Sequence, residues 1–352
     1  MTNKTIQIGK AKIGVKYPPF IIAEMSGNHN QSLDRALQIV EKAAECGVSA
    51  VKLQTYTADT ITLDLSKNEF FIKDKASLWS GKSLHQLYQE AFTPWEWHQP
   101  IMKRCKELGL ICFSSPFDFS AVDFLEELNV HAYKIASPEI VDIPLIKKAA
   151  STGKPLIIST GMATKTEIRD AVDVARKAGC KDLILLKCTS SYPADPKQAN
   201  LLTINDIKKR FCVEVGLSDH TLGIGVAVAA ISFGASVIEK HFTLRREDGG
   251  PDSAFSMEPD EMVLLVSESR KAWEAIGKVS YGPAGNEKKS LIGRRSLYIV
   301  KDMKKGDIFT PENIRSIRPS LGLPPKYYEK IIGKKIAKDA KKGTKLNWKL
   351  VK

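Results

Sequence analysis

The chain of 352 residues lacks the features that mark several protein classes. Its six cysteines are scattered without a C-x-x-C pair or zinc-ligand spacing, which argues against a disulfide framework or a zinc finger and indicates buried thiols in a reducing cytosol. No apolar run approaches the roughly 20 residues that a membrane-spanning helix needs, and the first residues contain no apolar signal segment. No G-x-G-x-x-G motif follows the first predicted strand, and there is no glycine-rich phosphate loop. We therefore expect a soluble, cytoplasmic protein with no membrane partner.

Positive charge is concentrated at one end of the chain. The net charge of +13 comes from 53 Lys and Arg against 40 Asp and Glu, and residues 286–352 alone carry 19 basic and 6 acidic groups. The rest of the chain is therefore neutral. A basic tail that grips nucleic acid or another acidic polymer is the non-enzymatic alternative, but its lysines are dispersed and lack interleaved aromatic residues or a nucleic-acid motif. We expect no nucleic-acid partner.

Strand and helix patterns alternate from residue 20 to residue 278. Short apolar runs rich in β-branched residues predict strands at 20–26, 50–56, 110–117, 132–137, 155–161, 183–188, 213–220 and 237–243. Several of the amphipathic stretches between them end at a glycine, among them Gly47 and Gly179. Eight such units in about 260 residues indicate an α/β fold of the (β/α)₈ TIM-barrel type, with a doubly wound sheet as the second choice.

The composition also divides the chain into domains. We expect a barrel domain at 1–278, a linker rich in glycine and proline at 279–289, and a small β-rich C-terminal domain at 290–352. A long insertion at 58–93, which contains Trp79, follows the second predicted strand. Because the loops after barrel strands form the catalytic rim, we expect this insertion to act as a lid.

Two histidines stand at the ends of neighbouring predicted strands. His220 lies in the segment SDHT and His241 in EKHF, so the closed barrel would bring them together. Imidazole with oxygen ligands suits Mn, Fe, Co or Zn, and a pair leaves positions open for substrate. The alternative is that each is a hydrogen-bonded structural histidine, the interpretation that we also give His29, although His29 lies close enough to the rim to touch a substrate.

Three lysines, Lys52, Lys134 and Lys187, lie on apolar predicted strands, where an unpaired charge is costly. We expect them to converge on the mouth of the barrel and to hold a phosphate or carboxylate together with hydroxyl groups. The hydroxyl donors are Ser115, Ser137, Ser159 and Ser218. A Schiff-base lysine is a competing function, and simple pairing of the lysines with Glu24, Glu139 or Glu239 is the structural alternative.

A set of collinear motifs resembles the sialic acid synthase family of phosphoenolpyruvate-condensing enzymes. The motifs are FIIAEMSGNHN, VKLQTYTADT, TPWEWH, YKIAS, STGMA, LLKCTSSYPA, GLSDHT, IEKHFT and GGPDSAFSMEP. The tail, including SIRPSLGL, is similar to the antifreeze-like (SAF) domain of these synthases. The resemblance implies a TIM barrel with a C-terminal SAF domain that joins phosphoenolpyruvate to an N-acyl amino sugar aldehyde and releases phosphate.

The resemblance also implies roles for individual residues. It makes Glu24, Lys52 and Glu139 catalytic, and assigns a divalent metal, Mn²⁺ before Mg²⁺ or Co²⁺, to His220 and His241. The residues implied to hold phosphoenolpyruvate are Lys52, Ser115, Lys134, Ser137, Ser159 and Ser218, and those implied to face the sugar are Gln54, Ser190, Tyr192 and Asp252.

One further sugar contact is implied across a homodimer. In this family an arginine matching Arg318 of the tail reaches the other subunit and touches the acyl group of the sugar. Ser190 departs from the family pattern, since sialic acid synthases carry an asparagine at this position, and this indicates a different sugar. The acceptor stays open among the amino-sugar precursors of several nine-carbon acids.

Overall fold

The computed structural model describes residues 4–75 and 77–352, so residues 1–3 of the expected barrel domain lie outside the described part. The chain forms two compact units, of which the first ends at Gly277 and the second spans Lys278–Lys352. None of the helices in the described ranges is both long and apolar enough to cross a membrane.

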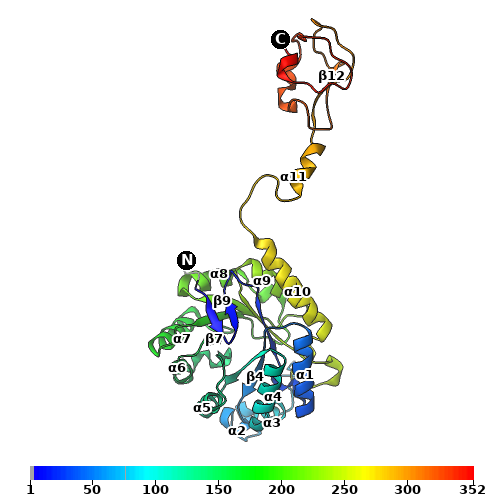
Figure 1. Ribbon diagram of the computed structural model, residues 1–352. Helices are drawn as coiled ribbons and strands as arrows, with labels where there is room; N and C mark the ends of the chain where they lie inside the picture. The colour runs from blue at the N-terminus through cyan, green and yellow to red at the C-terminus, as the bar shows by residue number, and fades with distance from the viewer. Residues whose placement is uncertain (1–3, 76) are drawn as a thin grey trace. The chain divides into compact units, whose positions relative to one another are not determined.

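Eight parallel strands close into a barrel in the first unit, with helices around the outside (Figure 1). The order around the barrel is β10-β3-β4-β5-β6-β7-β8-β9. The strands are β3 (Phe20–Glu24), β4 (Ala50–Thr55), β5 (Ile111–Pro116), β6 (Tyr133–Ile135), β7 (Leu156–Ser159), β8 (Leu183–Cys188), β9 (Glu214–Ser218) and β10 (Val237–His241). All eight predicted strands are present within a few residues of the expected bounds, so the TIM barrel is confirmed and the doubly wound sheet is wrong.

Local sequence signals start and stop the surrounding helices. The Ser32 side chain accepts the backbone N–H of Arg35 at the start of α1, and Thr164 forms a capping box at the start of α7. Gly47 and Gly179 follow their helices with φ of 79° and 104°, where a side chain would be strained. The outer helices are α1 (Leu33–Glu45), α4 (Trp95–Glu107), α5 (Phe119–Glu127), α6 (Ile143–Ser151), α7 (Lys165–Lys177), α8 (Leu202–Phe211), α9 (Gly225–Ser232) and α10 (Pro259–Ile276).

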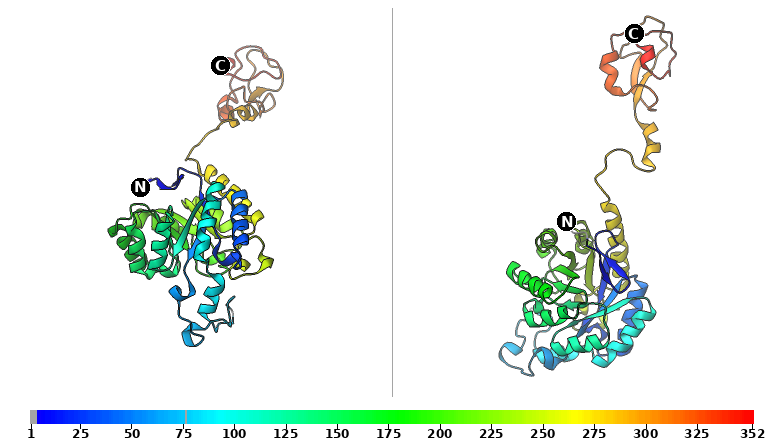
Figure 2. Two further views of the ribbon diagram at one scale, coloured as in Figure 1. Left: turned by 60° about the horizontal axis from the view of Figure 1, so that its bottom comes forward. Right: turned by 60° about the vertical axis from the view of Figure 1, so that its left-hand side comes forward.

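An N-terminal hairpin closes one end of the barrel. Strands β1 (Ile6–Ile8) and β2 (Ala11–Ile13) pair in antiparallel fashion, and their buried isoleucines join the apolar side chains inside the barrel, such as Phe20 and Phe113. The sequence analysis did not anticipate this hairpin. Figure 2 shows it at the end of the barrel opposite the insertion that follows β4.

The insertion has its own short helices, α2 (Ala58–Ile61), a 3₁₀ turn at Asn68–Phe70 and α3 (Leu84–Ala91). Capping boxes at Thr57 and Ser83 start the two helices. The indole Nε1 of Trp79 donates a hydrogen bond of 2.8 Å to the carbonyl of Pro251, in the loop after β10. The insertion is therefore tied across the barrel rim to a loop that carries a predicted site residue, Asp252.

Strand alternation decides which side chains reach the barrel interior. On β3, Phe20 and Ile22 pack in the inner apolar cluster and Glu24 follows in the same phase. On β10, Val237 belongs to the same cluster and Glu239 follows it. The interior is therefore apolar toward the N-terminal ends of the strands and ionisable at their C-terminal ends.

The second unit is built around a small apolar core. Its strands β11 (Ser296–Ile299) and β12 (Ile314–Ile317) are antiparallel, and its other elements are α11 (Glu287–Ser290), α12 (Tyr328–Ile331) and short 3₁₀ turns. The buried core is formed by Leu297, Ile299, Met303, Phe309, Ile314, Ile331, Ile336, Leu346 and Leu350. Isolated bridges, such as the one between Met303 and Ala340, add to this strand pairing within the described unit.

Candidate active site

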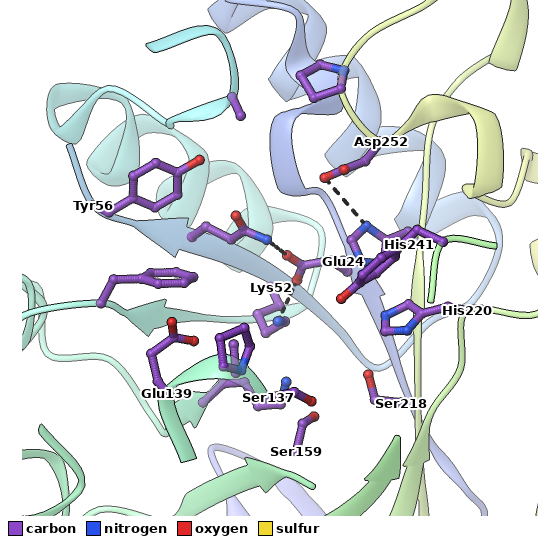
Figure 3. A pocket seen from close by; sticks show the side chains of 18 of the residues that line it. Glu24, Lys52, Tyr56, Ser137, Glu139, Ser159, Ser218, His220, His241 and Asp252 are labelled. Carbon is purple, nitrogen blue, oxygen red and sulfur yellow. Dashed lines mark hydrogen bonds and ion pairs between the residues drawn. The ribbon is translucent and has the colours of Figure 1, made fainter. Parts of the chain in front are cut away.

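A cavity of about 400 Å³ opens at the C-terminal ends of the barrel strands (Figure 3). The sequence analysis placed its candidate residues at these ends, and most of them line the cavity. They are Glu24, Lys52, Gln54, Lys134, Ser137, Glu139, Ser159, Tyr192, Ser218, His220, His241 and Asp252. The structure therefore brings together both proposed metal ligands, three candidate carboxylates and two of the lysines.

Three of the residues that the resemblance assigns to the site are not among those that line the cavity. Ser115 lies behind Lys52 and its hydroxyl is 3.3 Å from the Lys52 ammonium. Ser190 lies beside the cavity residue Cys188, with its hydroxyl 3.9 Å from the Cys188 sulfur. Arg318 is exposed in the second unit.

Lys187 does not join the other two lysines, so the expectation that all three converge is wrong. On β8, Ile184 and Leu186 point into the barrel, and Lys187 lies in the opposite phase. Its ammonium donates to the carbonyl of Cys188 (2.6 Å) and lies 3.2 Å from the Thr189 hydroxyl. Cys188, not Lys187, contributes to the cavity from this strand.

Lys52, Lys134 and two carboxylates form a buried network at the base of the cavity. The Lys52 ammonium lies 2.9 Å from Glu24 and 3.4 Å from Glu239, and the Lys134 ammonium lies 3.0 Å from Glu239. Burial alone would raise the pKa of Glu239, but Lys134 and Lys52 lower it to about 2. Burial lowers the pKa of Lys134. The expected alternative of lysine–carboxylate pairing is therefore present for both lysines, within the cavity itself.

Glu24 and Glu139 differ in how firmly they are held. Glu24 is paired with Lys52 and accepts a hydrogen bond of 2.8 Å from the amide of Gln54, although burial raises its pKa. The Oε2 atom of Glu139 is buried without a hydrogen-bond partner among the described residues, and desolvation raises the pKa of this carboxyl to about 7. A carboxyl that titrates near neutral pH is suited to proton transfer.

The two candidate metal ligands, His220 and His241, lie close together. Their ring centroids are 5.3 Å apart. The Nδ1 of His220 lies 2.9 Å from the carbonyl of Thr189, which can only accept, so this nitrogen carries a proton, and in the neutral ring Nε2 keeps a free lone pair. The Nδ1 of His241 is buried without a hydrogen-bond partner in the described ranges and lies 3.9 Å from Asp252.

The donor set fits a metal whose remaining ligands come from outside the chain. Burial and the neighbouring His220 hold the pKa of His241 well below its ordinary value, which keeps the ring in its neutral, ligating form. Within the described part of the chain, no group of three or more His, Cys, Asp or Glu is arranged to hold a metal ion. Two imidazoles therefore leave several coordination positions for water or substrate oxygens.

Cys188 is a thiol beside this pair that the sequence analysis did not select. Its sulfur lies 3.9 Å from the Nδ1 of His220. Burial raises the pKa of the thiol, but His220, Ser137 and Lys134 together lower it to about 7. The same contact raises the pKa of His220 against the effect of burial.

Aromatic and apolar side chains form the outer wall of the cavity. Tyr56 packs edge-on against Phe117 and Tyr88, with ring centroids 5.1 and 5.7 Å apart, and Trp79 lies 6.1 Å from the ring of Tyr192. The insertion contributes Ile61, Trp79, Leu87, Tyr88 and Ala91 to this wall. The sequence analysis missed Tyr56 as a site residue, although it continues the inward phase of Lys52 and Gln54 on β4.

His29 is a structural histidine rather than a wall residue. Its ring is fully buried, lies 3.2 Å from the hydroxyl of Thr93 and accepts the backbone N–H of Gln31. His98 is likewise buried, 2.8 Å from the hydroxyl of Thr55. Burial lowers the pKa of each histidine to about 4, so both rings are neutral at physiological pH.

Comparisons with known proteins agree with this fold. The NeuB family matches residues 39–281 and the SAF domain matches residues 294–352. The chain is 43% identical over 341 residues to a pseudaminic acid synthase of Campylobacter jejuni, covering 97% of this chain and 98% of the relative. It is 38% identical over 325 residues to an N,N'-diacetyllegionaminic acid synthase of the same species, covering 91% of this chain and 96% of the relative.

A solved structure agrees with both the fold and the family. The crystal structure of an N-acetylneuraminic acid (sialic acid) synthetase from Leptospira borgpetersenii matches with a TM-score of 0.72 and 32% identity, over 82% of this chain and 95% of that chain. The family match covers more than half of the chain, and the named relatives are synthases over nearly its full length. The chain is therefore an enzyme that belongs to the NeuB family and ends in a SAF domain.

Proposed function

We propose that the enzyme condenses phosphoenolpyruvate with 2,4-diacetamido-2,4,6-trideoxy-L-altrose and water to give pseudaminic acid and phosphate. The observation that carries this proposal is the 43% identity to a pseudaminic acid synthase over 97% of the chain. The chemistry of the cavity agrees with it, because the lysines, hydroxyls, histidines and carboxylates needed for such a condensation line one space.

Phosphoenolpyruvate would lie against the base of the cavity. Lys52 and Lys134 would bind its phosphate and carboxylate, with the hydroxyls of Ser137, Ser159 and Ser218 and with Ser115 supporting Lys52 from behind. The hydroxyl of Ser159 is buried and has no hydrogen-bond partner in the described part of the chain, which supports a ligand at this position. Binding would exchange part of the Lys–Glu pairing for contacts to the anion.

The enol carbon of phosphoenolpyruvate would attack the aldehyde carbon of the open-chain sugar. Members of this family generally depend on a metal, and a divalent cation on His220 and His241, with Mn²⁺ as the first candidate, would act as a Lewis acid toward the aldehyde oxygen. Asp252, at 3.9 Å from His241, would face the sugar on this side of the cavity together with Gln54, Ser190 and Tyr192.

Water would then add to C2 of the condensed intermediate, after which phosphate leaves with the bridging oxygen. Glu139 would take the proton from this water, since its carboxyl titrates near pH 7 and its Oε2 atom has no partner in the described ranges. Glu24 would orient the reactants, because Lys52 and Gln54 fix its position.

The outer wall supports a deoxy sugar as acceptor. The aldehyde carbon must lie near the base of the cavity, so the far end of the six-carbon chain would point toward the lid. There it would meet Ile61, Trp79 and Leu87, apolar side chains that favour a methyl group over a hydroxyl group at C6. The alternatives are the precursors of N-acetylneuraminate and legionaminate, and the legionaminic relative supports the second of these.

We further propose that the protein is a homodimer in the cytoplasm. Residues 279–289 would link the barrel domain to the SAF domain, and Arg318 would contact the acyl group of a sugar in the other subunit. Arg318 is exposed and therefore accessible for such a contact.

Acceptor turnover tests the proposed function. Purified protein is incubated with phosphoenolpyruvate, Mn²⁺ and each of the three sugars separately, and phosphate release and product mass are measured. We expect turnover with the altrose sugar. Turnover of N-acetylmannosamine or of the legionaminic precursor, with none of the altrose sugar, would overturn the assignment. Nucleic-acid binding that survives moderate salt, with no phosphate release, would instead support the non-enzymatic alternative.

A further inference from the structure

Lys240 is a buried lysine on the outer face of β10, between Glu239 and His241 of the cavity. Its side chain is 1% exposed. The ammonium lies 3.0 Å from Asp219 and donates to the carbonyls of Thr221 (2.6 Å) and Gly223 (2.9 Å). These three contacts use all three N–H donors of the ammonium group.

Asp219, the partner of Lys240, is equally well satisfied. Its Oδ1 accepts from the backbone N–H (3.0 Å) and the hydroxyl (2.9 Å) of Thr221, while Oδ2 faces Lys240. Its own backbone N–H donates to the carbonyl of Glu239 at 2.9 Å. Side chain and backbone together therefore link the segment after β9 to the C-terminal end of β10.

The two candidate metal ligands are the sequence neighbours of this ion pair. His220 lies between Asp219 and Thr221, and His241 directly follows Lys240. Because successive residues alternate in direction at the strand ends, the imidazoles point into the cavity and the ion pair lies behind them. Any movement between the segment after β9 and the end of β10 would change the 5.3 Å separation of the two rings.

We propose that the Asp219–Lys240 ion pair is a positioning device that holds His220 and His241 at the spacing required to bind one divalent cation. This inference rests on the proposed function, which assigns the metal to these histidines. A buried ion pair is a weak source of stability, since two apolar side chains of similar volume often serve as well. The ion pair differs from an apolar contact because its hydrogen bonds have a defined geometry.

Metal affinity measured without turnover tests the inference. Mn²⁺ is titrated calorimetrically into the full chain and into Asp219→Asn/Lys240→Met, a double variant that removes both charges together and leaves no uncompensated buried charge. We expect the dissociation constant for Mn²⁺ to rise roughly 10-fold or more, because losing groups that orient metal ligands typically costs 10- to 100-fold in affinity. Excess Mn²⁺ should restore kcat, and the visible spectrum of bound Co²⁺ should change.

Two controls separate positioning from folding and from the metal assignment. Lys208→Met/Glu214→Gln removes in the same way the ion pair between Lys208 and Glu214, 3.3 Å apart at the other end of β9, and should leave the Mn²⁺ affinity unchanged. His220→Ala should abolish Mn²⁺ binding; if it does not, the proposed metal site itself is wrong. If His220→Ala abolishes binding but the folded double variant keeps the wild-type affinity and Co²⁺ spectrum, the positioning role is refuted. If the double variant does not fold, Asp219→Asn/Lys240→Gln, which also leaves no uncompensated buried charge, is measured by the same criteria.

Discussion

Replacing Glu139 with glutamine should lower activity and raise stability at the same time. The native carboxyl titrates at about 7 rather than at its ordinary 4.5, because burial disfavours the charged form. Between these pH values the native state holds a proton that the unfolded chain has released, so the free energy of unfolding falls as pH rises through this window. The difference between the two pKa values lowers the free energy of unfolding by about 3 kcal/mol, and this loss is complete above pH 7.

Glu139→Gln keeps the shape of the side chain but never carries the buried charge. We therefore expect the variant to be more stable than the native protein at pH 8, by up to about 3 kcal/mol, with much less difference at pH 5. Loss of the general base should lower kcat roughly 100- to 10,000-fold and remove the inflection near pH 7 from the pH–rate profile.

Urea unfolding at pH 5 and pH 8 and a pH–rate profile from pH 5.5 to 9 check both parts of this prediction. The exposed Glu127 on α5 provides a matched control, and Glu127→Gln should change the free energy of unfolding by less than about 0.5 kcal/mol at either pH. If Glu139→Gln gains no stability at pH 8 and keeps the native pH–rate profile, the carboxyl neither carries a raised pKa nor transfers the proton.

Three further predictions concern the metal, the tail and acid stability. His220→Ala and His241→Ala should each lose bound metal and turnover, and a normal metal content measured by mass spectrometry in both variants would contradict the ligand assignment. Arg318→Ala should raise KM for the sugar while KM for phosphoenolpyruvate stays within about twofold, and an unchanged KM for the sugar in steady-state kinetics would argue against the contact between subunits. The buried His29 and His98 stay neutral down to about pH 4, whereas the unfolded chain takes up protons from pH 6.5. Each histidine should therefore lower the free energy of unfolding by up to about 3 kcal/mol as pH falls from 6.5 to 4. In urea unfolding, the free energy of unfolding should fall less steeply with decreasing pH for His98→Gln than for the native chain. Parallel pH dependences for the two proteins would refute this.

The barrel could be predicted from the sequence because its strands are short apolar runs separated by capped amphipathic helices. The C-terminal strand ends follow directly from such a prediction, and Glu24, Lys52 and His241 were found in this way. The phase of each strand was harder to assign. Both faces of a parallel barrel strand are apolar, so the sequence around Lys187 did not show which side chains point inward.

The contacts between side chains of different strands could be identified only in the structure. The pairing of Lys240 with Asp219 depends on the parallel register of β9 and β10 and on a turn that brings the carbonyls of Thr221 and Gly223 to one ammonium. The N-terminal hairpin was missed because its two strands have only three residues each. The isolated bridges of the second unit could not be predicted, because they have no periodic signal in the sequence.

The fate of oxygen in the reaction tests the central claim most directly. The protein is incubated with phosphoenolpyruvate, Mn²⁺ and the altrose sugar in heavy-oxygen water, and the released phosphate is analysed by mass spectrometry. Because water adds at C2 and the bridging oxygen leaves with phosphorus, we predict that a nine-carbon keto acid forms and that the phosphate is unlabelled. Labelled phosphate would show that water attacks phosphorus, and phosphate release without the keto acid would show that the cavity does not perform this condensation.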